Sequence, residues 1–111
     1  MNWTNITTPE QLNEIDLFSE QTAVLIFKHS TRCSISVAAL NRIERNWNEE
    51  AQNKLKVYYL DLLRYRNISD EIAQRYNIIH QSPQALIINK GKCIFSQTHS
   101  EIRLQDLISL A

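Results

Sequence analysis

The 111-residue sequence contains only one glycine, two prolines and two cysteines, and each low count excludes a class of protein. So little glycine and proline excludes collagen, low-complexity linkers and long disordered tails. Two cysteines can form neither a disulfide-dense scaffold nor a zinc site with four thiolates. The 12 basic residues balance the 12 acidic ones, so the chain lacks the basic excess that a general nucleic-acid-binding protein usually carries.

Long hydrophobic runs are absent as well. The longest run, Ala23–Phe27, is far shorter than the roughly 20 apolar residues that a membrane-spanning helix needs. Residues 1–6 are polar and are not followed by the apolar stretch of a secretory signal. We therefore expect a cytoplasmic protein that binds neither membranes nor nucleic acids, in a compartment where thiols stay reduced. The length predicts one domain, residues 1–111.

Strand and helix patterns alternate along the chain. The apolar run 23–28 is typical of a strand buried on both faces, and 56–61 predicts a second strand. Between them, apolar residues recur at spacings of three and four, which predicts one amphipathic helix over 34–51. The two strands and this helix would form a parallel βαβ unit.

Two further helices are predicted from their capping residues. One spans about 8–18, with Thr8 as its cap and Gln11 completing a capping box. The other begins at Ser69, whose side chain can cap it, and ends near Asn77.

The rest of the pattern completes a sheet. Residues 3–6 predict a short edge strand, and 85–89 and 93–98 predict a hairpin joined by a turn over 89–92 that holds the only glycine. A helix over 104–108 closes the chain. The resulting α/β order, (β)αβαβαββα, predicts a central mixed sheet flanked by helices. This is the thioredoxin-like arrangement, although periodicity alone also fits other small α/β folds.

Cys33 is the candidate nucleophile. It lies between the first buried strand and the long helix, where unpaired N–H groups and the positive end of the helix dipole favour a thiolate. Lys28, His29 and Arg32 add positive charge to the same turn. His29 could also donate a hydrogen bond to the thiolate, guide a partner thiol, or simply pack at the strand end. A buried or an unreactive cysteine fits the same residues.

No second thiol accompanies this cysteine. Ser36 stands three residues later, so the motif is Cys-x-x-Ser, and Thr31 and Ser34 complete a polar turn around Cys33. The other cysteine, Cys93, is predicted beside the hairpin turn at the far end of the sheet, too distant for a disulfide. The histidines and cysteines lack the spacing of a metal site, so no metal is expected.

Pro83 precedes a predicted strand, a place where proline is tolerated. Sequence alone favours a trans bond to Ser82. In a thioredoxin-like fold, however, this place holds a cis proline that faces the catalytic cysteine and leaves the preceding backbone free to pair with a thiol substrate. His99 follows the returning strand, so it is expected to flank the same groove.

The chain resembles the monothiol bacilliredoxins, which are small general-stress proteins of the bacillithiol redox system with a thioredoxin-like fold. One departure is Ser34, where the family usually has proline. The segments that carry the resemblance span nearly the whole chain: 27–33, 35–36, 65–69, 79–85 and 98–100.

The resemblance implies a cytoplasmic, monomeric thiol–disulfide oxidoreductase. Cys33 would remove bacillithiol from mixed disulfides on client proteins, and free bacillithiol or a reductase would then clear the adduct. Bacillithiol would be a co-substrate, with no bound cofactor, and Lys28 and Arg32 would attract its malate carboxylates. Two alternatives stay open: a non-catalytic thioredoxin-like interaction module, and an iron–sulfur carrier like the monothiol glutaredoxins.

Overall fold

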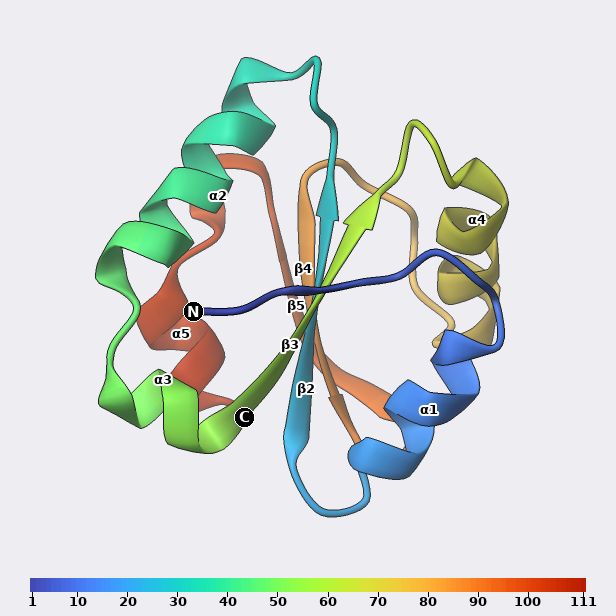
Figure 1. Ribbon diagram of the computed structural model, residues 1–111. Coiled ribbons are helices and arrows are strands. Elements are labelled where there is room, and N and C mark those ends of the chain that lie inside the picture. The colour runs from blue at the N-terminus through green and yellow to red at the C-terminus, as the bar shows by residue number, and fades with distance from the viewer.

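Five strands form one mixed sheet in the computed structural model, which describes residues 1–111 (Figure 1). The strand order is β1–β3–β2–β4–β5. β3 pairs in parallel with both β1 and β2, whereas β4 is antiparallel to β2 and β5 is antiparallel to β4. The strands are β1 (Thr4–Asn5), β2 (Ala23–His29), β3 (Leu55–Asp61), β4 (Gln84–Asn89) and β5 (Lys92–Thr98).

Helices cover both faces of the sheet, as Figure 1 shows. α1 (Gln11–Phe18) and α4 (Arg66–Arg75) pack on one face. The other face carries α2 (Ser34–Asn46), α3 (Glu49–Lys54) and α5 (Leu104–Ser109), and a short 3₁₀ helix, η1 (His99–Glu101), leads from β5 into α5. None of these helices combines the length and the apolar character required to span a bilayer.

β2 lies in the middle of the sheet, and all seven of its residues are buried. Leu25 and Phe27 join the hydrophobic cluster under α2, while Val24 and Ile26 join the cluster under α1 and α4. This double burial explains the unbroken apolar run in the sequence and confirms the predicted buried strand.

The predicted helix 34–51 is wrong in one respect, because it is two helices. The chain leaves the helical conformation at Trp47 (φ −55°, ψ 134°). Asn48 then caps α3, since its side chain accepts a hydrogen bond from the N–H of Ala51 at 2.8 Å. The apolar spacing continues through the break because both helices pack on the same core, where Ile43 and Ala51 belong to one cluster.

Two predicted side-chain caps are also wrong. α1 begins at Gln11, and the Thr8 side chain does not cap it. The Gln11 side chain does accept from the N–H of Thr8 at 3.0 Å, which is the part of the predicted capping box that the structure contains. α4 begins at Arg66, three residues before the predicted cap, so Ser69 lies buried inside the helix. The remaining elements follow the predicted order, which confirms the α/β architecture.

The hairpin between β4 and β5 fixes the position of Cys93. Lys90 and Gly91 adopt consecutive positive φ angles of 51° and 73°, the conformation of a type I′ turn, in which glycine costs no strain. Ser19 holds the turn, because its carbonyl and hydroxyl oxygens accept the N–H groups of Lys90 and Gly91, each at 2.8 Å. Cys93 therefore lies at the hairpin end of the sheet, as predicted.

Candidate active site

Three segments that are distant in sequence meet at one end of the sheet (Figure 1). Strand register pairs Lys28 at the end of β2 with Gln84 at the start of β4, and Gln84 with Thr98 at the end of β5. The turn that contains Cys33 follows β2, the proline segment precedes β4, and η1 follows β5. The three segments therefore lie at the same end of the sheet, opposite the end that carries the β4–β5 hairpin.

Cys33 is the N-cap residue of α2 and is half-buried. Its backbone is extended (φ −108°, ψ 119°), its carbonyl accepts the N–H of Val37 at 3.0 Å, and its own N–H donates to the Ser30 carbonyl at 3.2 Å. No side chain caps α2. The Cys33 side chain thus stands where an N-cap side chain normally accepts hydrogen bonds from the helix.

Ser36 and His29 form a buried pair one turn into α2. The Ser36 hydroxyl lies 2.7 Å from His29 Nδ1 and accepts the N–H of Ser30 at 3.0 Å. The His29 ring stacks on Phe27 at 6.0 Å between centroids and tilts against Tyr59 at 5.6 Å. The serine hydroxyl is therefore held rigidly where a dithiol protein has its second cysteine.

His29 does not face a partner protein, which corrects one predicted role. Its side chain is buried, and its hydrogen bond goes to Ser36 rather than to Cys33. Burial lowers the pKa of His29, although the negative charges of Asp61 and Glu44 act in the opposite direction. His29 is consequently neutral at pH 7 and packs at the strand end, the local alternative that the sequence left open.

Lys28 points to the opposite face of the sheet from His29, because side chains alternate along a strand. It is fully buried, and its Nζ donates to the Ser69 carbonyl at 3.1 Å and lies 3.2 Å from His80 Nδ1. No carboxylate lies within ion-pair distance of Lys28. Burial lowers the pKa of Lys28 to about 8, even though the charge of Asp70 acts to raise it.

The predicted attraction of a ligand's carboxylates by Lys28 is therefore wrong, because the ammonium group is inaccessible. Arg32, Thr31 and Ser34 are all exposed in the turn around Cys33. Their contribution to the thiolate or to a groove stays a prediction, and Arg32 is the cation of the turn that a ligand can reach.

The Ser82–Pro83 peptide bond is cis. A thioredoxin-like fold implied this conformation, whereas the general frequency of cis bonds before proline favoured trans. The Pro83 carbonyl accepts the N–H of His99 at 3.1 Å, which places His99 next to the proline segment. Gln84 ties the loop before the proline to the sheet, because its side chain donates to the Ile79 carbonyl at 3.0 Å. Whether His99 contacts a substrate stays a prediction.

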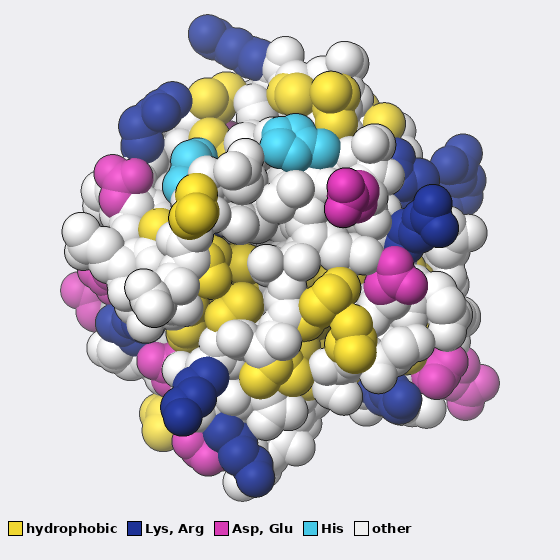
Figure 2. All heavy atoms as spheres, turned by 180° about the vertical axis from the view of Figure 1, so that it is seen from behind, with side chains coloured by type: hydrophobic (Ala, Val, Ile, Leu, Met, Phe, Trp, Pro, Cys, Tyr) yellow, Lys and Arg dark blue, Asp and Glu magenta, His cyan; other side chains and the backbone are white.

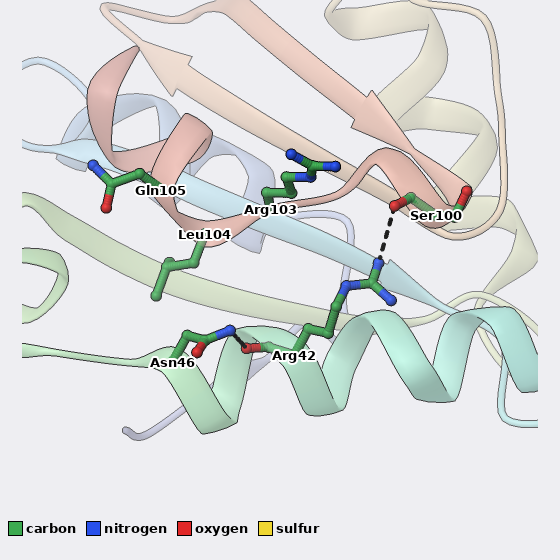
Figure 3. Close-up of a pocket in the computed structure, with 6 residues that line it drawn as sticks. All are labelled: Arg42, Asn46, Ser100, Arg103, Leu104 and Gln105. Atoms are coloured by element: carbon green, nitrogen blue, oxygen red, sulfur yellow. Dashed lines mark hydrogen bonds between the residues drawn. The ribbon is translucent and has the colours of Figure 1, made fainter.

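Arg42 links α2 to the segment that carries His99. Its guanidinium donates to the carbonyls of Ile102 at 3.1 Å and Ser100 at 3.5 Å. These contacts form one wall of a pocket of about 540 Å³ (Figure 3). Arg42 lies nine residues beyond Cys33, roughly 13 Å along the helix, so this pocket is separate from the cysteine turn. It is lined by Arg42, Asn46, Ser100, Arg103, Leu104 and Gln105.

Hydrophobic and histidine side chains gather on the surface at the same end of the molecule (Figure 2). His80 and His99 are exposed there. Ile79, in the loop before the cis proline, is 80% exposed, and Ile35, beside Cys33, is 47% exposed. Exposed apolar side chains in the segments at this end of the sheet suit contact with a protein surface.

Cys93 takes no part in this site. It is a free cysteine whose thiol donates to the Phe95 carbonyl at 3.4 Å and packs against the cluster under α1 and α4. Burial raises the pKa of its thiol. Cys93 is therefore a structural residue, as the sequence indicated.

Sequence reasoning missed His80, Ser69 and Arg42 as members of the site's surroundings. His80 contacts Lys28 across 52 residues of sequence, and Arg42 contacts Ile102 across 60. No local pattern reports such contacts. One signal was available: strand alternation already requires Lys28 and His29 to point to opposite faces.

Comparison with protein families gives one match over almost the whole chain. The family model described as monothiol bacilliredoxin BrxC matches residues 4–107. This match agrees with the single-cysteine turn at the start of α2 and the cis proline described above.

Solved structures show the same fold. A protein described as a candidate oxidoreductase with a thioredoxin fold is 26% identical, with a TM-score of 0.80 over 96% of this chain and 90% of that one. Thioredoxin from Malassezia sympodialis is 19% identical, with a TM-score of 0.76 over 97% and 89%. Thioredoxin from Trypanosoma brucei brucei is 17% identical, with a TM-score of 0.70 over 97% and 92%. The predicted thioredoxin-like fold is confirmed.

Replacing the buried Lys28 with methionine should stabilise the protein at neutral pH. The folded state loses the Lys28 proton near pH 8 and the unfolded state near pH 10.5, so the cost of burying the charge is largest below pH 8 and shrinks as pH rises. We expect Lys28→Met to raise the free energy of unfolding by roughly 1–3 kcal/mol at pH 7. The advantage should fall between pH 8 and pH 10, as urea denaturation at each pH would show. An advantage independent of pH would contradict a buried, titrating lysine.

Proposed function

The chain belongs to the monothiol bacilliredoxin family, and we propose that it removes bacillithiol from mixed disulfides on client proteins with Cys33 as its only reacting thiol. The observation that carries this proposal is the pairing of two positions on α2. Cys33 is the N-cap residue of the helix and its thiol is half-buried, and one turn later the place of a second thiol holds the buried hydroxyl of Ser36.

The start of α2 places hydrogen-bond donors beside Cys33. The N–H groups of Ser34, Ile35 and Ser36 belong to the first helical turn and donate to no atom of the chain. A thiolate at the N-cap position can accept from these groups, and the helix dipole adds its positive end. These N–H groups are the only polar partners that the mechanism assigns to the sulfur, since His29 bonds to Ser36 instead.

The reaction is a thiol–disulfide exchange in two steps. The Cys33 thiolate attacks the bacillithiol sulfur of the mixed disulfide; a new disulfide forms between Cys33 and bacillithiol, the original disulfide breaks, and the client leaves as a thiolate. A second bacillithiol, or a reductase thiol, then attacks the adduct and regenerates the Cys33 thiolate. Each step breaks one disulfide and forms another. The exchange therefore needs no oxidant or reductant other than the thiols and disulfides that take part.

The adduct has no internal route to resolution. Ser36 cannot form a disulfide, and Cys93 lies at the opposite end of the sheet. A disulfide requires Cα atoms within about 7 Å, which the strand register prevents for Cys33 and Cys93. The adduct must therefore await an external thiol, which is the behaviour expected of a monothiol protein.

Oxidised bacillithiol should add one bacillithiol to Cys33. We expect intact mass spectrometry to show a single adduct on the wild type, none on Cys33→Ser, and an unchanged adduct on the matched variant Cys93→Ser, because only Cys33 lies at a helix start. Oxidised glutathione is the control for the identity of the small thiol.

Two results would contradict this proposal. An adduct that still forms on Cys33→Ser would show that a sulfur other than that of Cys33 reacts. Equal reaction with both small disulfides would leave a thiol-exchange protein without a preference for bacillithiol.

A second thiol at position 36 should change the mechanism from monothiol to dithiol, with the adduct resolved inside the protein. Ser36→Cys would place a thiol one helical turn from Cys33, on the same face of α2. We expect the adduct to release bacillithiol without added thiol, as an internal disulfide forms with Cys33. Peptide mapping under non-reducing conditions checks this, and a persistent adduct would show that the buried site of Ser36 cannot deliver a sulfur to Cys33.

A further inference from the structure

A fully buried lysine with no carboxylate partner demands an explanation, because a buried charge costs stability. Lys28 is such a residue, and the only side chain with which it forms a hydrogen bond is the imidazole of His80. Burying an ammonium group in this way is common at functional sites and rare elsewhere. Lys28 has no role in the exchange steps described above.

The contact fixes which nitrogen of His80 carries the proton. Lys28 Nζ can only donate, so His80 Nδ1 accepts at 3.2 Å, and the ring proton lies on Nε2. Ser69 supports the arrangement, since its carbonyl accepts from Lys28 and its hydroxyl lies 3.2 Å from the same Nδ1. Nε2 makes no hydrogen bond within the chain, and His80 is exposed. A donor N–H is therefore presented at the surface.

His80 presents this donor at the same end of the sheet as the cysteine turn. It lies three residues before the cis proline, in a loop that the Gln84 side chain anchors through the Ile79 carbonyl. Gln84 in turn pairs with Lys28 across the β2–β4 ladder, and Cys33 follows β2 by four residues. The hydrogen-bonded pair of Lys28 and His80 thus leads from the core to the end of the sheet where a mixed disulfide would be bound.

We propose that Lys28 and His80 form a proton relay that protonates the client thiolate as it leaves the mixed disulfide. His80 is the catalytic acid, and Lys28 acts through it as a positioning residue and proton source. This inference rests on the proposed function and adds to it the residues that serve the leaving group.

The relay accounts for the electron pair of the broken disulfide and for each proton that moves. When Cys33 bonds to the bacillithiol sulfur, the client sulfur leaves with the electron pair of the broken disulfide. That sulfur takes the proton from His80 Nε2, and His80 Nδ1 takes one from Lys28 Nζ. The products are a client thiol, a neutral His80 in its other tautomer and a neutral Lys28. Water then protonates the exposed His80 Nε2, and His80 Nδ1 returns its proton to the buried Lys28.

The charges around both groups suit this role. Burial lowers the pKa of Lys28 to about 8, close to the value of roughly 8.5 for an ordinary thiol, so the proton transfer is nearly balanced. Burial, followed by the charge of Lys28, lowers the pKa of His80; Asp70 acts to raise it and Arg66 to lower it. His80 is therefore neutral at pH 7, as a relay requires.

The test compares two leaving thiols that differ in their need for a proton. One substrate is a short cysteine peptide carrying bacillithiol, and the other is the mixed disulfide of bacillithiol with thionitrobenzoate, an acidic thiol that leaves without protonation. With the peptide, His80→Gln should lower the second-order rate constant about 10- to 100-fold. With thionitrobenzoate, the rate constant should change less than about twofold.

Two variants complete the design. His99→Gln, the other exposed histidine at this end of the sheet, is the matched control, and any effect should be equal for both leaving thiols. With the peptide, the wild-type rate should decline above about pH 8 as Lys28 loses its proton, and this decline should disappear in Lys28→Met.

An equal loss on both substrates in His80→Gln, or no loss on either, would overturn the relay while leaving Cys33 exchange in place. Failure of the wild type to react with either substrate would overturn the proposed function, and the relay with it. A decline above pH 8 that persists in Lys28→Met would remove Lys28 from the relay.

Discussion

The burial of β2 on both faces is the constraint on which the rest of the structure depends. The strand must send alternate side chains into two separate cores, so its last two residues diverge. His29 turns toward α2 and holds Ser36, while Lys28 turns toward α4 and holds His80. Only after both anchors are made does the chain reach Cys33, which is left half-buried at the start of α2.

This arrangement separates the nucleophile from the groups that surround it. Cys33 stands beside the unpaired N–H groups of the first helical turn, whereas the side chains of Lys28 and His29 form hydrogen bonds with neighbouring segments. The Ser36 hydroxyl of the Cys-x-x-Ser motif is buried and hydrogen-bonded. The site therefore has one sulfur, and the hydroxyl one turn further along α2 is fixed in place. Under the proposed function, this site would carry an adduct until an external thiol removes it.

Local patterns predicted most of the fold and the centre of the site. The apolar run of β2, the positive-φ hairpin and the cysteine at a helix start are all properties of neighbouring residues. The break at Trp47 escaped prediction because the apolar spacing passes through it unchanged. The burial of Lys28 and its contact with His80 escaped prediction because the contact joins residues 52 positions apart, which a local sequence pattern cannot reveal.

The most direct measurement is the mass of the covalent species formed in one turnover with a bacillithiolated client protein. Equimolar protein and client, quenched by acid and analysed intact, should give Cys33 carrying bacillithiol and a fully reduced client. Peptide mapping should place the adduct on Cys33 alone, because Cys93 lies at the hairpin end of the sheet. A disulfide between Cys33 and the client, with free bacillithiol released, would contradict the account.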